Sequence, residues 1–355
     1  MTVPGQMSGV QLTGHGGPEK LVWRDDIPIP QPGAGEVLVR VLAAGVNNTD
    51  INTRIGWYSK DSAGATDSGE VSGDGGWAGA LAFPRIQGGD ICGEVVALGD
   101  GVDRVLTGAR VTCPTNLPRP TSQAPTAVEV LGSEFDGAFA QFCRLAVADI
   151  HDVSSAPLSD IEIAAMPCAF GTAENLLTRA AVGAGDRVLI TGASGGVGLA
   201  AVQLAVLRGA AVTGVCSPAK ADAVRDAGAV EMLERDAAPG PQSFDAVIDV
   251  VGGPGWGALI EALRPSGRYA VSGAIAGPIV EADLRTIYLN DLTILGCTYQ
   301  PHEVFDHLVA LINAGNVRPL VSKTYPLRDI ARAQEDFLSK RYPGKLVLIP
   351  PEVHL

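Results

Sequence analysis

Residues 187–209 have the sequence RVLITGASGGVGLAAVQLAVLRG, and this stretch decides the fold. The apolar run from Val188 to Ile190 predicts a buried strand, and residues 197–208 predict an apolar helix that Gly209 ends. Glycine allows the intervening backbone to turn tightly and approach a pyrophosphate, while the helix N-terminus supplies free N–H groups and a positive dipole end. The stretch therefore predicts a strand–turn–helix unit that binds a dinucleotide. The turn contains Gly192, Gly195, Gly196 and Gly198.

Composition and charge limit the class of protein. The chain has 355 residues, of which 46% are hydrophobic, and this length favours two domains. Its net charge of −13 argues against a nucleic-acid or anionic membrane surface, because such surfaces need clustered Lys and Arg. No uninterrupted apolar run approaches the roughly 20 residues of a membrane span, and residues 1–10 lack the pattern of a signal peptide. We therefore expect a soluble cytoplasmic protein that binds neither nucleic acid nor membrane.

The six cysteines are widely spaced, and none lies in a Cys-x-x-Cys motif. This spacing predicts neither a disulfide framework nor a zinc ribbon. A buried apolar role fits most of them, because cysteine is among the most buried residue types. They are Cys92, Cys113, Cys143, Cys168, Cys216 and Cys297.

Two kinds of pattern follow each other along the chain. Residues 1–150 contain short, partly alternating apolar runs separated by Pro and Gly, which predict a β-rich region. Residues 158–300 alternate strand and helix patterns, which predict a doubly wound parallel sheet covered on both faces. The predicted elements are strands at 36–42, 93–99 and 109–113 in the first region, strands at 211–215, 244–251, 267–273 and 292–297 with a helix at 220–226 in the second, and a helix at 331–338 and a strand at 345–349 in the tail.

Residues 57–83 differ from the rest of the chain, because they are rich in glycine, acidic and without periodicity. The pattern fits a long surface loop near a site, a mobile lid or a passive insertion. If the loop lies near a site, we expect it to influence the choice of substrate.

Several motifs together connect the chain to a known family. They are GVNNTD at 45–50, RIGWY at 54–58, GGDICG at 88–93, GAFA at 137–140, ASGGVG at 193–198, DVVG at 249–252 and GKLVL at 344–348. With these motifs the chain resembles the medium-chain dehydrogenases/reductases, specifically their zinc-free quinone oxidoreductase branch, over nearly its whole length. The resemblance implies an α/β protein with an active site in a cleft between two domains. These are a GroES-like β-rich catalytic domain of residues 1–157 and 303–355, and a Rossmann NADP-binding domain of residues 158–302.

The resemblance also implies a site without catalytic zinc. Zinc-dependent relatives place a cysteine at the position of Asn47 and a histidine at that of Gly89, and their third ligand position resembles Cys168. Catalytic zinc needs three protein ligands and an open position, and two of the three are replaced here. The structural zinc lobe of those relatives needs four closely spaced cysteines, where this chain offers only Cys113. We therefore predict no metal in the protein.

Without a metal, side chains or water must stabilise the negative charge that hydride transfer places on oxygen. Tyr58 is the first catalytic candidate, because it matches a Gly-x-Tyr position of the zinc-free branch. Asn47 matches an asparagine that faces the nicotinamide there, and Thr49 matches the hydroxyl of a proton relay in the zinc enzymes. Structural alternatives stay open, since Asn47 could satisfy a turn and Thr49 could cap a helix.

The end of the second predicted strand favours NADPH over NADH. NAD enzymes usually carry Asp or Glu there to bind the ribose 2′-hydroxyl, but residues 215–220 are VCSPAK, without a carboxylate. Ser217 and Lys220 offer a hydroxyl and a cation for a 2′-phosphate, although Lys220 could equally be an ordinary exposed helix residue. The expected cofactor-binding residues are Asn47, Thr172, Gly195, Gly196, Val197, Ser217, Lys220, Val251, Gly252, Gly273, Ala274 and Ile275.

With the resemblance, these residues predict an NADPH-dependent oxidoreductase that transfers hydride to a quinone or an activated alkene (enone) without metal. One alternative is a zinc-free alcohol dehydrogenase or ketone reductase. Another is a catalytically idle binding protein, which the intact glycine motif argues against. Residues 292–297 form an apolar strand that would be an exposed edge if unpaired, and in the family the corresponding strands pair across a two-fold axis. We therefore expect a homodimer that acts on a small carbonyl, enone or quinone.

Overall fold

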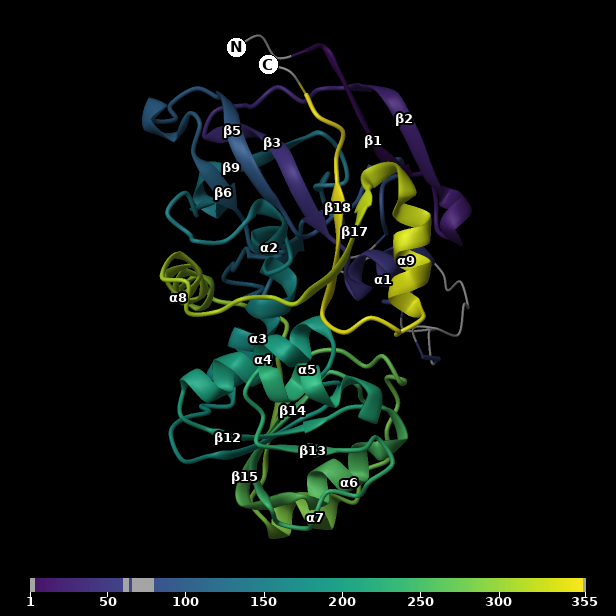
Figure 1. Cartoon of the computed structure of the whole chain (residues 1–355), viewed down its shortest axis with the longest axis vertical. Coiled ribbons are helices and arrows are strands. Elements are labelled where there is room, and N and C mark those ends of the chain that lie inside the picture. The colour runs from purple at the N-terminus through teal and green to yellow at the C-terminus, as the bar shows by residue number, and fades with distance from the viewer. Residues whose placement is uncertain (1–3, 60–63, 66–79, 354–355) are drawn as a thin grey trace. The chain divides into compact units, whose positions relative to one another are not determined.

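The structure is a computed structural model, and it describes two compact units that are treated separately below (Figure 1). The sequence places the domain boundaries at 157/158 and 302/303, whereas the units divide at 168/169 and 300/301. Most of the segment expected to form a loop at 57–83 lies outside the described residues. The described residues are 4–59, 80–168 and 301–353 in unit 1, and 64–65 and 169–300 in unit 2.

Unit 1 is built on β-sheets, which confirms the GroES-like fold. Its largest sheet has the strand order β10-β6-β5-β3-β18-β17, with β9 also pairing to β3. Val37, Val39 and Val41 of β3 are buried in the core of the unit. β18 pairs antiparallel with β3, with Val347 opposite Gly45, so the last strand of the chain lies beside the strand that leads into the first helix. The strands are β1 (Gln6–Leu12), β2 (Leu21–Pro28), β3 (Glu36–Gly45), β4 (Arg85–Ile86), β5 (Cys92–Leu98), β6 (Arg110–Thr112), β7 (Asn116–Pro118), β8 (Val128–Val130), β9 (Phe142–Ala146), β10 (His151–Asp152), β17 (Val321–Pro326) and β18 (Lys345–Ile349).

Helices pack on the sheets of unit 1, and α2 (Asp160–Ala164) contacts the central strands β3 and β5. The predicted helix at 331–338 is confirmed as α9, which packs on β17 and β18. On α1, the Arg54 guanidinium donates from Nε to Gln334 of α9 at 3.0 Å, which ties these two helices together. The helices are α1 (Asn48–Ile55), α2 (Asp160–Ala164), the start of α3 (Pro167–Arg179), α8 (His302–Asn313) and α9 (Ile330–Leu338), with 3₁₀ turns at Pro18–Lys20, Arg104–Leu106, Val147–Asp149 and Leu327–Asp329.

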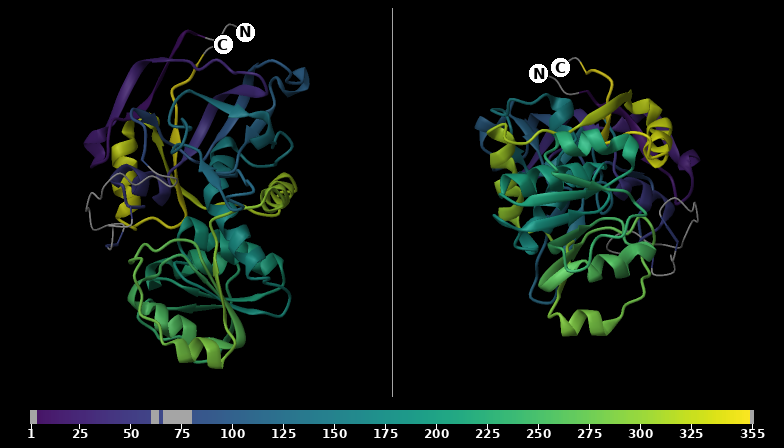
Figure 2. Two further views of the ribbon diagram at one scale, coloured as in Figure 1. Left: turned by 180° about the vertical axis from the view of Figure 1, so that it is seen from behind. Right: turned by 60° about the horizontal axis from the view of Figure 1, so that its bottom comes forward.

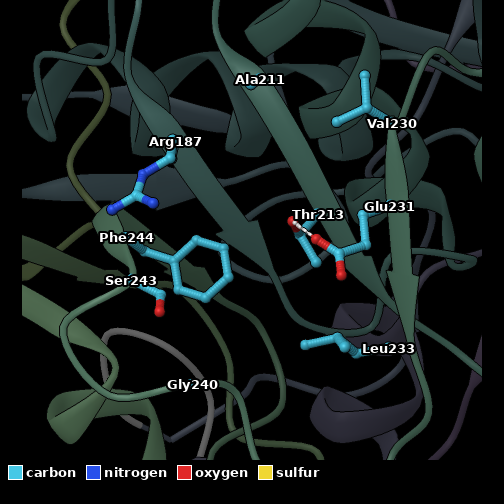
Figure 3. A pocket seen from close by; sticks show the side chains of 9 residues that line it. All are labelled: Arg187, Ala211, Thr213, Val230, Glu231, Leu233, Gly240, Ser243 and Phe244. Atoms are coloured by element: carbon cyan, nitrogen blue, oxygen red, sulfur yellow. Dashed lines mark hydrogen bonds between the residues drawn. The ribbon is translucent and has the colours of Figure 1, made fainter.

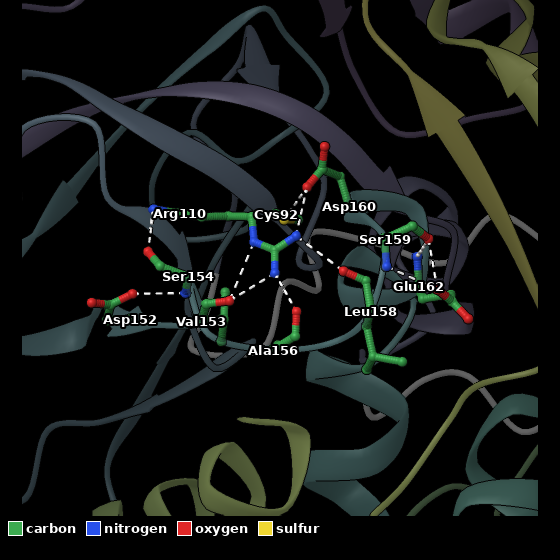
Figure 4. Close-up of polar contacts among 10 residues, drawn as sticks. All are labelled: Cys92, Arg110, Asp152, Val153, Ser154, Ala156, Leu158, Ser159, Asp160 and Glu162. Atoms are coloured by element: carbon green, nitrogen blue, oxygen red, sulfur yellow. Dashed lines mark hydrogen bonds and ion pairs between the residues drawn. The ribbon is translucent and has the colours of Figure 1, made fainter. Parts of the chain in front are cut away.

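Arg110 of β6 holds the segment that leads into α2 (Figure 4). Its guanidinium donates to the carbonyl oxygens of Val153, Ala156 and Leu158 at 2.8–3.2 Å and also pairs with Asp160. A guanidinium has five donors in a rigid fork, so one side chain can satisfy several carbonyls that a loop would otherwise leave unpaired. This anchor fixes the path of the chain toward α2 and the first turn of α3.

Unit 2 contains one parallel sheet with the order β13-β12-β11-β14-β15-β16, which confirms the Rossmann-like fold. Helices α4 and α5 lie on one face of the sheet and α6 and α7 on the other (Figure 1, Figure 2). Every residue of β14 is buried, as expected for a central parallel strand covered on both faces. The elements are the rest of α3, β11 (Arg187–Ile190), α4 (Gly196–Leu207), β12 (Ala211–Val215), a 3₁₀ turn (Pro218–Lys220), α5 (Ala221–Asp226), β13 (Glu231–Leu233), β14 (Phe244–Asp249), a 3₁₀ turn (Gly253–Gly255), α6 (Trp256–Glu261), β15 (Leu263–Val271), α7 (Leu284–Leu289) and β16 (Thr293–Gly296).

Within the part of the chain that the structure describes, no helix has both the length and the apolar character that a membrane crossing requires.

Candidate active site

The glycine turn of unit 2 joins β11 to α4 at the carboxyl end of the sheet. Gly192 has a φ of +56°, a left-handed conformation that glycine adopts without strain. A Cβ atom at Gly198 would collide with the carbonyl oxygen of Gly192, so only glycine allows the helix to begin this close to the strand. Gly195 is the exposed N-cap residue of α4, and the first N–H groups of a helix have no intrahelical partner. The turn therefore fits a pyrophosphate, as the sequence predicts.

A buried carboxylate shapes the next turn along the same edge of the sheet. Asp249, the last residue of β14, is fully buried. Its oxygens accept hydrogen bonds from the Thr191 hydroxyl at 2.6 Å, the Tyr269 hydroxyl at 2.5 Å and the Val251 and Gly252 N–H groups at 2.8 and 3.2 Å. The sequence analysis selected Val251 and Gly252 but missed this anchor. The predicted strand ran to residue 251, whereas β14 ends at Asp249, so the sequence placed this carboxylate inside the strand.

The turn after β15 is joined to the turn after β14. The Ala276 N–H donates to the Val251 carbonyl at 2.9 Å, and the Ser272 N–H donates to the Asp249 carbonyl at 3.1 Å. Thr172 lies on α3, and no hydrogen bond among the described residues links it to the glycine turn. The turns after β14 and β15 thus bring Val251 and Gly252 together with Gly273, Ala274 and Ile275.

Two cations follow neighbouring strands at this edge. The Cys216 N–H donates to the Leu233 carbonyl at 3.0 Å, which joins the ends of β12 and β13. Lys220 lies in the 3₁₀ turn after β12, where its N–H donates to the Ser217 carbonyl at 3.0 Å. Burial lowers the pKa of Lys220, and the nearby positive charge of Arg235 lowers it further. The sequence analysis missed Arg235, because only the pairing of β13 with β12 brings it near Lys220.

In unit 1, the first turn of α1 holds two buried polar side chains. Asn47 is the N-cap residue of the helix, and its backbone N–H donates to the Asp50 carboxylate at 2.9 Å. Burial raises the pKa of Asp50 to about 7, and the Asp90 carboxylate adds to the rise. The Asn47 N–H and the Lys345 ammonium act in the opposite direction. Asn47 and Asp50 form a capping box, in which the Asn47 side chain also meets the Asp50 backbone N–H. Asn47 therefore has the structural role that the sequence left open as an alternative, and its amide nitrogen remains to be explained.

A buried ammonium group lies beside the Asn47 side chain. Lys345, the first residue of β18, is 3% exposed, and its Nζ donates to Asn47 Oδ1 at 2.5 Å and to Asp90 Oδ2 at 2.8 Å. Asp90 is fully buried, and its Oδ1 accepts from the Cys168 backbone N–H at 2.6 Å and the Thr115 hydroxyl at 3.3 Å. The sequence analysis missed Lys345 as a site residue, since it lies 298 positions from Asn47.

Thr49 connects two further polar side chains in unit 1. Its hydroxyl lies in the first turn of α1 and forms hydrogen bonds with the Tyr58 phenol and the Cys168 thiol, while Tyr58 also bonds with Asn52. Burial raises the pKa of Tyr58 above its ordinary value, so the phenol stays protonated at neutral pH. Burial likewise raises the pKa of Cys168 to about 12, so its sulfur is a thiol and not a thiolate. The three predicted catalytic residues therefore share one end of α1.

A hollow of about 300 Å³ in unit 2 lies at the opposite end of its sheet from the glycine turn (Figure 3). It is lined by the first residues of four strands, which are Arg187, Ala211, Glu231 and Phe244. These mark the amino end of the parallel sheet, whereas the glycine turn lies at the carboxyl end, where open α/β sheets bind their ligands. We therefore do not assign the hollow to the cofactor.

Comparison with known proteins identifies the family. A model of the alcohol dehydrogenase GroES-like domain matches residues 33–155, and a zinc-binding dehydrogenase model matches residues 219–348. Quinone oxidoreductase from Rattus norvegicus is 27% identical and covers 97% of this chain and 98% of its own. A solved structure from Sinorhizobium meliloti 1021, named as a candidate alcohol dehydrogenase, is 42% identical over 98% of both chains, with a TM-score of 0.90. The chain belongs to the medium-chain dehydrogenase/reductase superfamily, in its quinone-oxidoreductase-like branch.

Membership in this superfamily establishes the general chemistry. Acryloyl-coenzyme A reductase from Metallosphaera sedula is also similar, with 28% identity over 91% of this chain and 95% of its own. The superfamily uses nicotinamide cofactors, and its oxidoreductases act on small molecules. The protein is thus an oxidoreductase, which agrees with the fit of the glycine turn to a pyrophosphate.

The zinc-binding name of one family model calls for a test of whether the site fits a metal. Among the residues that the structure describes, no three His, Cys, Asp or Glu side chains are grouped to hold an ion. A Cβ at Gly89 would lie 2.5 Å from the Thr115 methyl group, whose hydroxyl is bonded to the Gly89 carbonyl at 2.8 Å. The Lys345 ammonium donates to Asn47 and Asp90 and repels a second cation there. These residues do not fit a zinc ion.

Proposed function

We propose that this protein is an NADPH-dependent reductase that transfers hydride to a quinone or an activated alkene without a metal ion. The observation that carries this proposal is the set of hydrogen-bond donors around the start of α1, where Asn47 stands at a position at which zinc-dependent relatives place a metal ligand. These donors are the Asn47 amide and the Thr49 and Tyr58 hydroxyls. The names of the rat and Metallosphaera relatives support this substrate class.

Unit 2 supplies the proposed cofactor site. The N–H groups of Gly196 and Val197 face the pyrophosphate, and Gly195, whose own N–H donates to the Gly192 carbonyl at 2.9 Å, lets the backbone approach it. Ser217, Lys220 and Arg235 bind the 2′-phosphate. A phosphate between two cations binds more strongly than a ribose hydroxyl would, because hydrogen bonds between ionised groups are stronger than neutral ones. Thr172 and the turns at 251–252 and 273–275 receive the nicotinamide end. When bound, NADPH supplies the hydride.

Unit 1 supplies the groups that stabilise the substrate oxygen. Hydride addition to a carbonyl or to the β-carbon of an enone leaves negative charge on that oxygen, and aimed donors in a buried site stabilise it strongly. Tyr58 suits this role, because its raised pKa keeps the O–H in place as a donor. The Thr49 hydroxyl touches the phenol and can pass a proton toward it. The proton that completes the product comes from solvent through these hydroxyls.

A second candidate function is reduction of simple ketones, or oxidation of the matching alcohols. The Sinorhizobium structure favours it, because that chain is 42% identical and is named as a candidate alcohol dehydrogenase. The same donors would stabilise an alkoxide, so the site geometry serves both reactions.

A parallel panel tests the proposal. The purified protein is mixed with NADPH or NADH and with an enone, a quinone or a simple ketone, and its zinc content is measured. We expect NADPH oxidation with the enone or the quinone, far less than one zinc per chain, and activity that survives chelators. Turnover of the ketone alone would favour the second candidate. NADPH binding without any turnover would indicate an idle binding protein, and stoichiometric zinc lost together with activity would overturn the metal-free assignment.

A further inference from the structure

The buried lysine of unit 1 acts together with the capping box of α1 to fix which way the Asn47 amide faces. An ammonium group has donors only, so the amide atom that meets Lys345 Nζ must be the oxygen. The observed contact, from Nζ to Asn47 Oδ1 at 2.5 Å, has this sense. The Asn47 amide is thereby oriented with its oxygen toward Lys345 and its nitrogen away from it.

This orientation leaves the Asn47 Nδ2 group buried and without an acceptor. Asn47 is 6% exposed, and its Nδ2 has no hydrogen-bond partner among the described residues. The nearest carboxylate on α1, Asp50, is engaged by the Asn47 backbone N–H. A buried donor without an acceptor is unfavourable, so one that persists in a folded protein points to an acceptor that arrives with a ligand.

The lysine is itself held firmly, so it can act as a fixed support. Its second contact is the ion pair with Asp90, whose other oxygen accepts from the Cys168 backbone N–H. A Cβ at Gly45 would collide with the Asp90 carboxylate, so the packing around the pair depends on a glycine at the end of β3. The support thus comes from β18, which places Lys345, and from β3, which allows Asp90 to approach.

We propose that Lys345 is a positioning residue that aims the Asn47 Nδ2–H at a carbonyl oxygen of the bound reactants. This inference rests on the proposed reductase function. Lys345 touches neither substrate nor cofactor in this role, and it acts only through Asn47. The acceptor is either the substrate oxygen or the carboxamide oxygen of the nicotinamide. A variant would lose only kcat in the first case and would also lose NADPH affinity in the second.

A double-mutant cycle separates this role from a purely structural ion pair. We expect Lys345→Met to lower kcat by up to about 10²-fold, approaching the loss in Asn47→Ala, since Asn47→Ala removes the aimed donor and Lys345→Met removes the contact that aims it. If Lys345 acts through Asn47, the combined variant is no slower than Asn47→Ala alone. If the two single losses of kcat multiply in the combined variant, the proposal is overturned. Because Lys345→Met leaves Asp90 unpaired, Lys345→Met with Asp90→Asn is measured as well, and it should show the same loss of kcat.

Ligand binding identifies the acceptor in the same variants. A loss of kcat with unchanged NADPH affinity indicates the substrate oxygen, and weaker NADPH binding indicates the nicotinamide carboxamide. In both cases 2′-phospho-ADP-ribose, which lacks the nicotinamide, should bind as in the wild type. Weakened binding of that probe would show damage beyond Asn47 and would count against the proposal.

A readout without turnover keeps the inference distinct from the proposed function. In protein labelled with ¹⁵N-asparagine, the Asn47 side-chain NH₂ signal is assigned by its absence in Asn47→Ala. We expect Lys345→Met to shift this signal in the ligand-free protein, because the amide loses its fixed orientation. An unmoved signal would overturn the inference. If no substrate of the panel is reduced, the proposed function fails, while the signal still tests the contact.

Discussion

Tyr58 illustrates how burial changes the chemistry of a single side chain. Its phenol lies against Thr49 and Asn52, and its pKa is raised above the ordinary value, chiefly by burial. The charged phenolate is therefore disfavoured, and the side chain acts as a neutral donor over the physiological range. The same cause raises the pKa of Cys168 to about 12, so its thiol is also neutral at physiological pH.

Replacing Tyr58 with Phe should slow turnover without affecting cofactor binding. Loss of one aimed donor typically lowers kcat by about 10²–10³-fold, and Phe keeps the ring that fills the site. Steady-state kinetics with the best substrate of the panel and a fluorescence titration with NADPH measure the two effects. Tyr288→Phe is the matched control, because that tyrosine is 62% exposed on α7. Full turnover in Tyr58→Phe would exclude this role and move attention to Thr49.

Asp50 should make the stability of the protein depend on pH. Its pKa is raised to about 7 in the folded chain, first by burial and then by Asp90, against Lys345 and the Asn47 N–H. Other titratable groups coupled to it are Tyr58 and Cys168. The folded chain thus keeps a proton that the unfolded chain releases near pH 4, so the free energy of unfolding falls as pH rises from about 4 to 7 and is flat above.

The variant Asp50→Asn removes this titration. The urea midpoint of the variant, compared with that of the wild type, should rise between pH 5 and pH 7. The corresponding difference in the free energy of unfolding grows by at most about 1.4 kcal/mol per pH unit. Asp226→Asn, at an exposed aspartate of α5, is the control and should leave the pH profile unchanged. Parallel profiles for Asp50→Asn and the wild type would show that Asp50 ionises normally in the folded chain.

At the scale of elements, the carboxyl edge of the parallel sheet gathers the cofactor groups. Strands β11, β12, β13 and β14 all end there, because they run parallel. Each end contributes something different: a glycine turn after β11, Lys220 after β12, Arg235 after β13 and the Asp249 anchor at the end of β14. Local sequence specifies each turn, and the sheet brings the turns together.

The cations after β12 and β13 should set the preference for NADPH. Lys220→Ala and Arg235→Ala should each weaken NADPH binding by about 10-fold or more, since each removes a charge-assisted hydrogen bond, and should leave NADH binding unchanged. Fluorescence titration with both cofactors measures this. Arg225→Ala is the control, because Arg225 of α5 pairs with Asp222 instead. Tighter binding of NADH than of NADPH by the wild type would refute the assignment.

At the scale of the whole molecule, unit 2 has an apolar edge. β16 is the last strand of the six-stranded sheet, and it is short. Exposed strand edges and clustered apolar side chains are typical of surfaces that another chain covers. We therefore retain the proposal of a homodimer in which two β16 edges meet around a two-fold axis. The exposed apolar residues on β16, on α7 and just before it are Ile279, Val280, Leu284, Tyr288, Leu289 and Ile294.

Light scattering at micromolar concentration should give twice the chain mass of 36.5 kDa. Ile294→Arg should shift the protein toward the monomer, because a charge would be buried at the centre of the interface. Val105→Arg is the control, since Val105 is 78% exposed and belongs to unit 1, not to the sheet of β16. A monomeric wild type would refute the dimer.

The sequence by itself determined the local units. The strand at 188–190, the glycine turn and the helix at 197–208 appear as β11 and α4 (Gly196–Leu207), because they depend on short-range periodicity and on glycine conformation. The start of α1 was likewise predictable as a site, since the motif at 45–50 holds Asn47 and Thr49 within three positions of each other. Residues this near in the chain keep their relation whatever the rest of the fold does.

Only the tertiary structure decided the partners of these residues. Lys345 reaches Asn47 because β18 pairs with β3 across 298 positions, and Arg235 reaches Lys220 because β13 pairs with β12. The raised pKa of Asp50 depends on complete burial, which no local pattern encodes. Strand pairing and burial are long-range consequences of packing the whole chain, so the charge that orients the Asn47 amide becomes visible only in the folded molecule.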